Sequence, residues 1–246
     1  MSPGRQSWST AGSPSADAAE PAQIDPRWSV VGALWVLSAF VTVGEQVQSS
    51  LDHWSVGDGR SALWHATAAL DETAKKRYPG LDKESRFKRV IRDDVDIFAA
   101  MTAPDINLVE SRFPVPVPSD LPDRRPDIAD VLYGVHRYLH EDESAMLAGC
   151  EVTAHADGVP MFEIARGRLW LRGSAALGLL GIAVFAAENK GEQIPPAYNL
   201  GWREHVFHIS GWWGWQNHFR DIVSHASIPQ FTLDFAEEWD TWGPVA

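Results

Sequence analysis

Residues 127–143 carry the pattern that most narrows the fold of this chain, because their apolar side chains recur with the period of an α-helix. On a helix with 3.6 residues per turn these side chains fall on one side, as they do in a helix that packs on a hydrophobic core. They are Ile128, Val131, Leu132, Val135 and Leu139. The segment therefore predicts an amphipathic helix and a mainly helical domain built around it.

A second side of the same helix brings four chemically active side chains together. They fall at offsets of zero, four, seven and eight and are Tyr133, Arg137, His140 and Glu141. An imidazole moves protons near neutral pH, and a guanidinium stabilises charge that develops on a phosphate. Both groups are needed for metal-free cleavage of RNA through its own 2′-hydroxyl. The structural alternative pairs Arg137 with Glu141 and leaves His140 half buried.

A metal site is the alternative use of this helix, because His136 and His140 stand four residues apart. Two imidazoles at that spacing reach one metal ion from a single face of a helix. The residue after His136 is Arg137 and not the Glu that a zinc protease uses as its general base. A third ligand would come from Glu141, Cys150, His155 or a distant histidine, and the sequence does not choose among them.

The overall charge argues against a protein that coats nucleic acid. The chain has 246 residues and a formal net charge of -12, whereas unspecific binding of nucleic acid depends on Lys and Arg. A local exception lies between residues 75 and 92, where eight cations could guide a phosphate backbone, although interleaved Asp and Glu would partly neutralise them. The predicted nucleic-acid contacts are Lys75, Lys76, Arg77, Arg86 and Arg89.

The rest of the chain suggests a mainly α (α+β) protein, with a bundle of four to five helices and a small three-stranded β meander. Residues 1–26 read as a disordered leader, residues 27–190 as the helical core with its meander, and residues 191–246 as a Trp-rich C-terminal extension packed on the core. Before residue 127 the expected helices are 27–51, 60–78 and 82–101, followed by an extended loop with six prolines at 104–126. The expected strands are 150–155, 160–165 and 168–172, and an apolar helix is expected at 174–187.

Several sequence features bear on partners and location. Six of the 12 tryptophans lie in the last fifty residues, which predicts either internal packing or an interface, with a second copy or with a partner protein. The first residues lack the layout of a signal peptide, and the strongest apolar run, 30–43, is too short to span a bilayer. The single cysteine excludes an internal disulfide, and no cofactor fingerprint is present. We therefore expect a cytoplasmic protein without a membrane segment or a cofactor.

The segment around residue 135 resembles HEPN-like helical domains of bacteria. The resemblance is carried by residues 129–133, Ala-Asp-Val-Leu-Tyr, and by residues 137–141, Arg-Tyr-Leu-His-Glu. It covers residues 27–190 and implies an all-helical, frequently dimeric bundle in which two Arg-x(4–6)-His motifs meet and cleave RNA without metal. Only two residues separate Arg137 from His140 here. Arg203 and His208 have a four-residue spacing but lie outside the expected helical core.

Many HEPN proteins act in bacterial conflict systems as toxins or antiphage effectors. Others have lost catalysis and serve as binding modules. The resemblance therefore implies a protein of a bacterial defence or toxin system, either a metal-independent endoribonuclease acting on RNA or a non-catalytic interaction module. The metal-dependent hydrolase that would use His136 and His140 is a further alternative.

Overall fold

Helix α2 (Val43–Ser55) is the first element that this computed structural model describes, and a capping box starts it. The Thr42 hydroxyl accepts a hydrogen bond from the Glu45 amide at 3.1 Å, and the Glu45 carboxylate accepts one from the Thr42 amide at 2.7 Å. The prediction of one continuous helix through 27–51 is wrong, because Thr42 has an extended backbone and α2 begins only after it. The described residues are 41–140, 150–153, 162–165, 168–226 and 228–245, so the predicted leader lies outside them.

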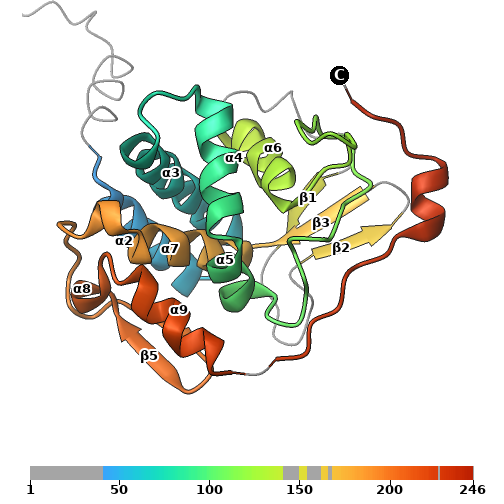
Figure 1. Cartoon of the computed structure of the whole chain (residues 1–246). Helices are drawn as coiled ribbons and strands as arrows, with labels where there is room; N and C mark the ends of the chain where they lie inside the picture. Colours follow the sequence, from blue (N-terminus) through green and yellow to red (C-terminus); the bar gives the residue numbers. More distant parts are fainter. Residues whose placement is uncertain (1–40, 141–149, 154–161, 166–167, 227, 246) are drawn as a thin grey trace, which may run out of the picture. The chain divides into compact units, whose positions relative to one another are not determined.

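The described part of the chain is mainly helical, as the sequence predicts (Figure 1). The predicted helix 82–101 is divided at Asp94 into two helices, and helices α8 (Ile209–Trp212) and α9 (Gln216–Ser224) lie where no helix was predicted. None of the helices in this part of the chain is long and apolar enough to cross a membrane. After α2 the helices are α3 (Gly59–Arg77), α4 (Lys83–Asp93), α5 (Val95–Thr102), α6 (Ile128–His140), α7 (Ala175–Phe185), α8 (Ile209–Trp212) and α9 (Gln216–Ser224), with the 3-10 turns η2 (Ala187–Asn189) and η3 (Ala236–Asp240).

Helix α7 is apolar on all sides because it packs against α2, α3 and α5 together. Glycine permits this close approach. A Cβ on Gly178 would lie 2.5 Å from the Phe98 ring of α5, and one on Gly181 would lie 2.9 Å from Met101. The two glycines therefore set the distance between the central helix and α5.

Three strands form at the predicted places but do not make a meander. They are β1 (Cys150–Thr153), β2 (Phe162–Ala165) and β3 (Arg168–Arg172), and their order in the sheet is β1-β3-β2. Two residues connect β2 to β3, which suits an antiparallel pair, and β1 then pairs in parallel with the other edge of β3. The prediction of a meander is thus wrong, since strand order depends on which edge of β3 is open and not on the order of the strands in the chain.

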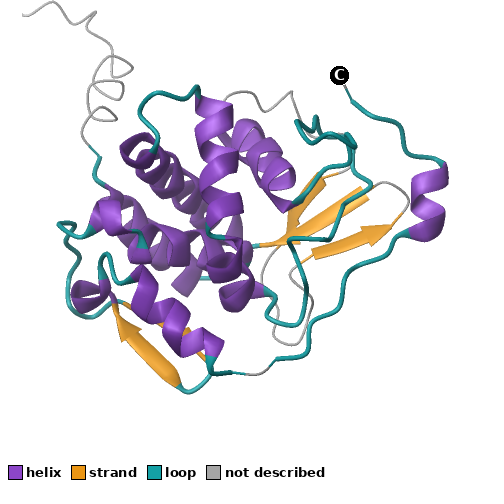
Figure 2. Ribbon diagram, in the orientation of Figure 1, coloured by secondary structure: helices purple, strands orange, loops and turns teal. Residues whose placement is uncertain are grey.

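A second sheet was missed by the sequence analysis. Strands β4 (Asn199–Trp202) and β5 (His205–His208) form an antiparallel hairpin, which Figure 2 shows as separate from the three-stranded sheet. The turn contains Arg203 at a φ of 52°, a conformation that favours glycine, so the usual hairpin signal is absent from the sequence.

A cluster of aromatic side chains near the C-terminus packs inside the protein. The Phe185 and Phe219 rings stack with their centroids 4.3 Å apart, and Phe207 and Trp212 pack edge-on at 4.6 Å. Trp202 and Trp213 are also buried. Internal packing, one of the two uses predicted for this Trp-rich region, is therefore confirmed, whereas its use as an interface stays a prediction.

A buried ion network joins α4 to α6. The Lys88 ammonium lies 2.8 Å from the Asp130 carboxylate, and both side chains are almost completely buried. Arg92 also reaches Asp130, at 3.1 Å, and binds Asp127 and Asp120 at 2.7 Å. Because buried charges are tolerated only when they are paired, this network holds the first turn of α6 against α4.

We expect Lys88→Ala to lower the free energy of unfolding by about 3 kcal/mol, because Asp130 would stay buried with less positive charge around it. Lys75→Ala is the matched control, since Lys75 is partly exposed beside Asp71 and should cost less than about 1 kcal/mol. Urea denaturation of both variants measures the difference. Equal losses would show that the buried pair does not hold the two helices together.

Candidate functional site

Helix α6 follows the predicted amphipathic pattern. Ile128, Val131, Leu132 and Val135 are buried in the core. Asp127 caps the helix, since its carboxylate accepts a hydrogen bond from the Asp130 amide at 2.9 Å. The prediction of a core-facing helix is confirmed. The orientation of α6 then determines where its polar side chains lie.

His140 is partly buried and is held against α3. Its Nε2 lies 3.1 Å from the Trp64 carbonyl oxygen and 2.9 Å from the Thr67 hydroxyl. A carbonyl oxygen only accepts hydrogen bonds, so Nε2 carries the proton and donates it to this pair of oxygens. The ring also stacks on the Trp64 indole with centroids 4.6 Å apart. Burial lowers the pKa of His140 to about 4, although the hydrogen bond to Trp64 opposes that shift, so the imidazole is neutral at pH 7.

Of the other three residues of the predicted cluster, Tyr133 does not share an open surface with His140. Tyr133 is buried because α4 covers it, with the Phe87 ring 5.7 Å away and the Lys88 ammonium 5.5 Å from its ring centre. Arg137 is exposed, one helical turn further on. Glu141 lies outside the described residues.

His136 lies between two rings in the interior and is only 2% exposed. Its ring stacks on Phe87 at 4.7 Å and lies 4.6 Å from the ring of His140. Neither ring nitrogen has a hydrogen-bond partner among the described residues. Burial, together with charge on His140, lowers the pKa of His136 to about 2, so its ring is neutral throughout the physiological range.

The metal alternative finds no complete ligand set in the part of the chain that the structure describes. No group of three or more His, Cys, Asp or Glu side chains is arranged there to hold a metal ion. Two of the proposed third ligands, Glu141 and His155, lie outside the described residues, and Cys150 begins β1.

The cations predicted to contact nucleic acid are engaged by carboxylates of the same chain. Arg77 lies 2.6 Å from the buried Asp94 and 3.0 Å from Glu188. Arg86 is 3.1 Å from Asp71. The remaining pairs are Lys75 with Glu72, Lys76 with Glu192, and Arg89 with Asp93. The positive charge of this segment is therefore largely neutralised within the fold, as the interleaved acidic residues suggested.

Two further histidines extend the cluster in a way the sequence did not indicate. His65 donates from Nδ1 to the Gln46 side-chain oxygen at 2.7 Å, and its ring packs edge-on against Trp64 at 4.6 Å. The ring of His53 stacks on His65 at 5.3 Å and lies beside Asp58. His53 lies on α2 and His65 on α3, so only the packing of these helices brings the two rings into one cluster with Trp64 and His140.

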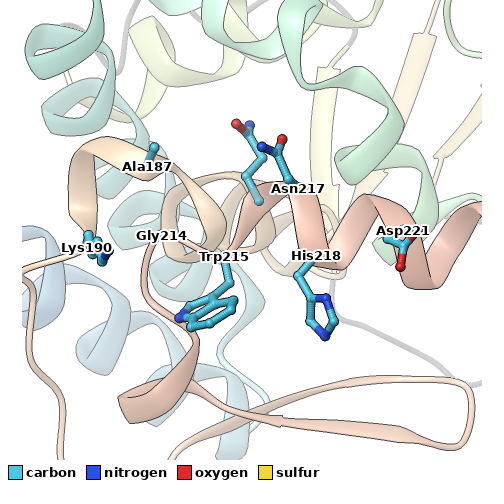
Figure 3. A pocket seen from close by; sticks show the side chains of 8 residues that line it. Ala187, Lys190, Gly214, Trp215, Asn217, His218 and Asp221 are labelled. Atoms are coloured by element: carbon cyan, nitrogen blue, oxygen red, sulfur yellow. The ribbon is translucent and has the colours of Figure 1, made fainter.

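A concave surface near the C-terminus was also missed by the sequence analysis. It is a groove of about 610 Å³ between η2 and the start of α9. Figure 3 shows Lys190 at one end, Asp221 at the other, and the rings of Trp215 and His218 between them. The one signal in the sequence is Trp215 beside Gly214. The sequence alone does not distinguish this exposed tryptophan from the buried Trp202 and Trp213.

The low pKa of His136 predicts a pH dependence of stability. Below about pH 6.5 the unfolded chain takes up a proton at His136, but the folded chain does not do so until its pKa of about 2. The neutral His136 therefore contributes its full amount to the free energy of unfolding above about pH 6.5, and this contribution is lost as the pH falls. His136→Phe should remove about 1.4 kcal/mol per pH unit of this loss between about pH 6 and pH 4.

Urea denaturation at a series of pH values measures the slope for the wild type and for His136→Phe. His208→Phe, at an exposed ring, is the matched control for the loss of one imidazole. Identical slopes for the wild type and His136→Phe would contradict the buried, neutral state of His136.

Comparison with known proteins places the chain in a bacterial family. The family Rv1289 matches residues 42–239. Uncharacterized protein Mb1320 of Mycobacterium bovis and uncharacterized proteins MT1327 and Rv1289 of Mycobacterium tuberculosis are each 49% identical to the chain over 207 residues. The alignments cover 83% of this chain and 99% of each relative. No solved structure matches it. Because the match extends over most of the sequence, the chain belongs to the Rv1289 family.

Proposed function

We propose that this protein is a HEPN-like, non-catalytic interaction protein of a bacterial defence or toxin system, and that it binds a partner protein with a basic surface. The proposal favours the binding alternative over the endoribonuclease. The observation that carries it is the position of His140, whose Nε2 donates to the Trp64 carbonyl oxygen of α3. A side chain held in this way joins two helices, and its Nε2 is already engaged by α3.

The protonation state of His140 also disfavours RNA cleavage. Cleavage through the 2′-hydroxyl needs a group that accepts a proton and a group that donates one. With a pKa of about 4, only about one His140 ring in a thousand is protonated at pH 7. Arg137 alone would stabilise a phosphate but would not move the proton.

The HEPN-like part of the proposal rests on the helical core and on the sequence of α6. Arg137 and His140 occupy the last turn of α6, but two residues separate them where the cleaving members have four to six. A shortened spacing is what a member without catalysis would tolerate, because a binding module does not need the motif.

The charge of the chain supports a basic protein as the partner. The formal net charge is -12, and the predicted RNA-contacting cations are already paired with carboxylates. The acidic excess therefore attracts positively charged surfaces and repels a phosphate backbone. A basic protein of the same system would fit this field better than free RNA.

The catalytic alternative is tested by incubating purified protein with a mixed-sequence RNA in EDTA at about pH 7. We expect no cleavage above background from the wild type, from His140→Ala or from Arg137→Ala, since the proton donor is nearly absent. Gel analysis of end-labelled RNA measures the products. Metal-independent cleavage that both substitutions abolish, in variants with wild-type circular dichroism, would overturn the proposal.

The partner is tested by capture on the tagged full chain from an extract of the source bacterium, at about 0.1 M and 0.5 M salt. We expect a protein of net positive charge that is released at the higher salt, because screening weakens the attraction between opposite charges. Capture of an acidic partner, or binding that does not change with salt, would contradict the basic-partner proposal. Light scattering of the protein alone tests the homodimer that the HEPN resemblance implies.

A further inference from the structure

The groove between η2 and α9 is separate from the histidine cluster of α6. Its walls come from η2 and from the first turns of α9, and it is an open groove with a volume of about 610 Å³. That volume is within the range of sites that bind one small organic molecule. Trp215 is the main apolar surface, with 52% of its side chain exposed.

Hydrogen bonds to the core fix both walls of the groove. Asn189 is buried and donates to the Ala183 carbonyl oxygen and the Thr73 hydroxyl, each at 2.8 Å, which anchors the residue before Lys190. On the other wall, the Gly214 amide donates to the Val184 carbonyl oxygen at 3.0 Å. The groove is therefore formed before any ligand arrives.

Gly214 also lets the two walls approach each other. Its φ is +80°, and a Cβ at this position would lie 2.8 Å from Cβ of Lys190. Any larger residue would strain the backbone and push the lysine stem away. The glycine thus sets Lys190 at the edge of the groove beside Trp215.

The polar groups of the groove are available for a ligand. Within the described ranges, the Lys190 ammonium and the Asp221 carboxylate make no ion pair or side-chain hydrogen bond, in contrast to the cations of α3 and α4. The ring of His218 stacks on Trp212 at 5.5 Å and meets Trp215 edge-on at 6.0 Å. The exposed face of Trp215, with the His218 ring at a steep angle to it, therefore lies between a cation at one end and a hydrogen-bond acceptor at the other (Figure 3).

We propose that this groove binds a flat aromatic acid of one or two rings, which carries a hydroxyl or amino group opposite its acid group. The ring system packs against Trp215 and His218, the acid group pairs with Lys190, and the opposite group donates to Asp221. This inference is independent of the proposed interaction function, because none of these residues belongs to the α6 cluster.

Isothermal titration of the full chain with three matched compounds tests the assignment. The probes are 6-hydroxy-2-naphthoate, 2-naphthoate without the hydroxyl, and 2-naphthol without the acid. We expect 6-hydroxy-2-naphthoate to bind about tenfold more tightly than either analogue, since each analogue lacks one charge-assisted contact.

Variants assign each contact to its residue. Lys190→Gln should abolish the preference for 6-hydroxy-2-naphthoate over 2-naphthol, and Asp221→Asn should reduce the preference over 2-naphthoate. Trp215→Ala should weaken binding of all three compounds about tenfold, through the loss of the stacking surface. Phe231→Ala is the matched control, because Phe231 is also 52% exposed but does not line the groove.

No heat of binding for any probe at millimolar concentration would overturn the proposal. Binding that Trp215→Ala and Lys190→Gln both leave unchanged, in variants that melt like the wild type, would also overturn it by placing the compounds elsewhere.

Discussion

The buried pair of Lys88 and Asp130 sets the position of α6, on which the histidine cluster depends. Both charges are almost completely buried, so separating them would leave a buried charge without its partner. The pair therefore holds α4 and α6 in one register. That register places Phe87 of α4 over His136 and leaves the last turn of α6 to pack on α3. The same contact that stabilises the bundle thereby keeps His136 away from open solvent and sets His140 against α3.

Pairing of charges within the chain recurs on a larger scale. Arg77 and Arg220 both bind Asp94, and Arg92 binds three aspartates, so cations that look available in the sequence are used to join helices. An acidic protein with its cations engaged in this way keeps a negative field toward its surroundings. The basic-partner proposal follows from this distribution of charge more than from any single residue.

Helix α7 supports the groove from within the core. Its glycines admit α5 closely on one side, and the carbonyl oxygens of Ala183 and Val184, near its C-terminal end, hold both walls of the aromatic-acid groove. Hydrogen bonds to the core thus hold the walls of the groove in place. For this reason the groove keeps its shape although its lining residues are largely exposed.

The sequence by itself determined the helix of residues 128–140, its apolar side and the places of three strands, because the periods of helices and strands are local properties. Only the tertiary structure decided the order of those strands, the ring contacts of His140 and the ion pairs of Lys88. Each of these joins residues far apart in the chain: Trp64 meets His140, and Asp130 meets Lys88. A periodic pattern shows which side of a helix is buried, but the partner on that side is chosen by packing, and the chemistry of the side chain follows from the partner.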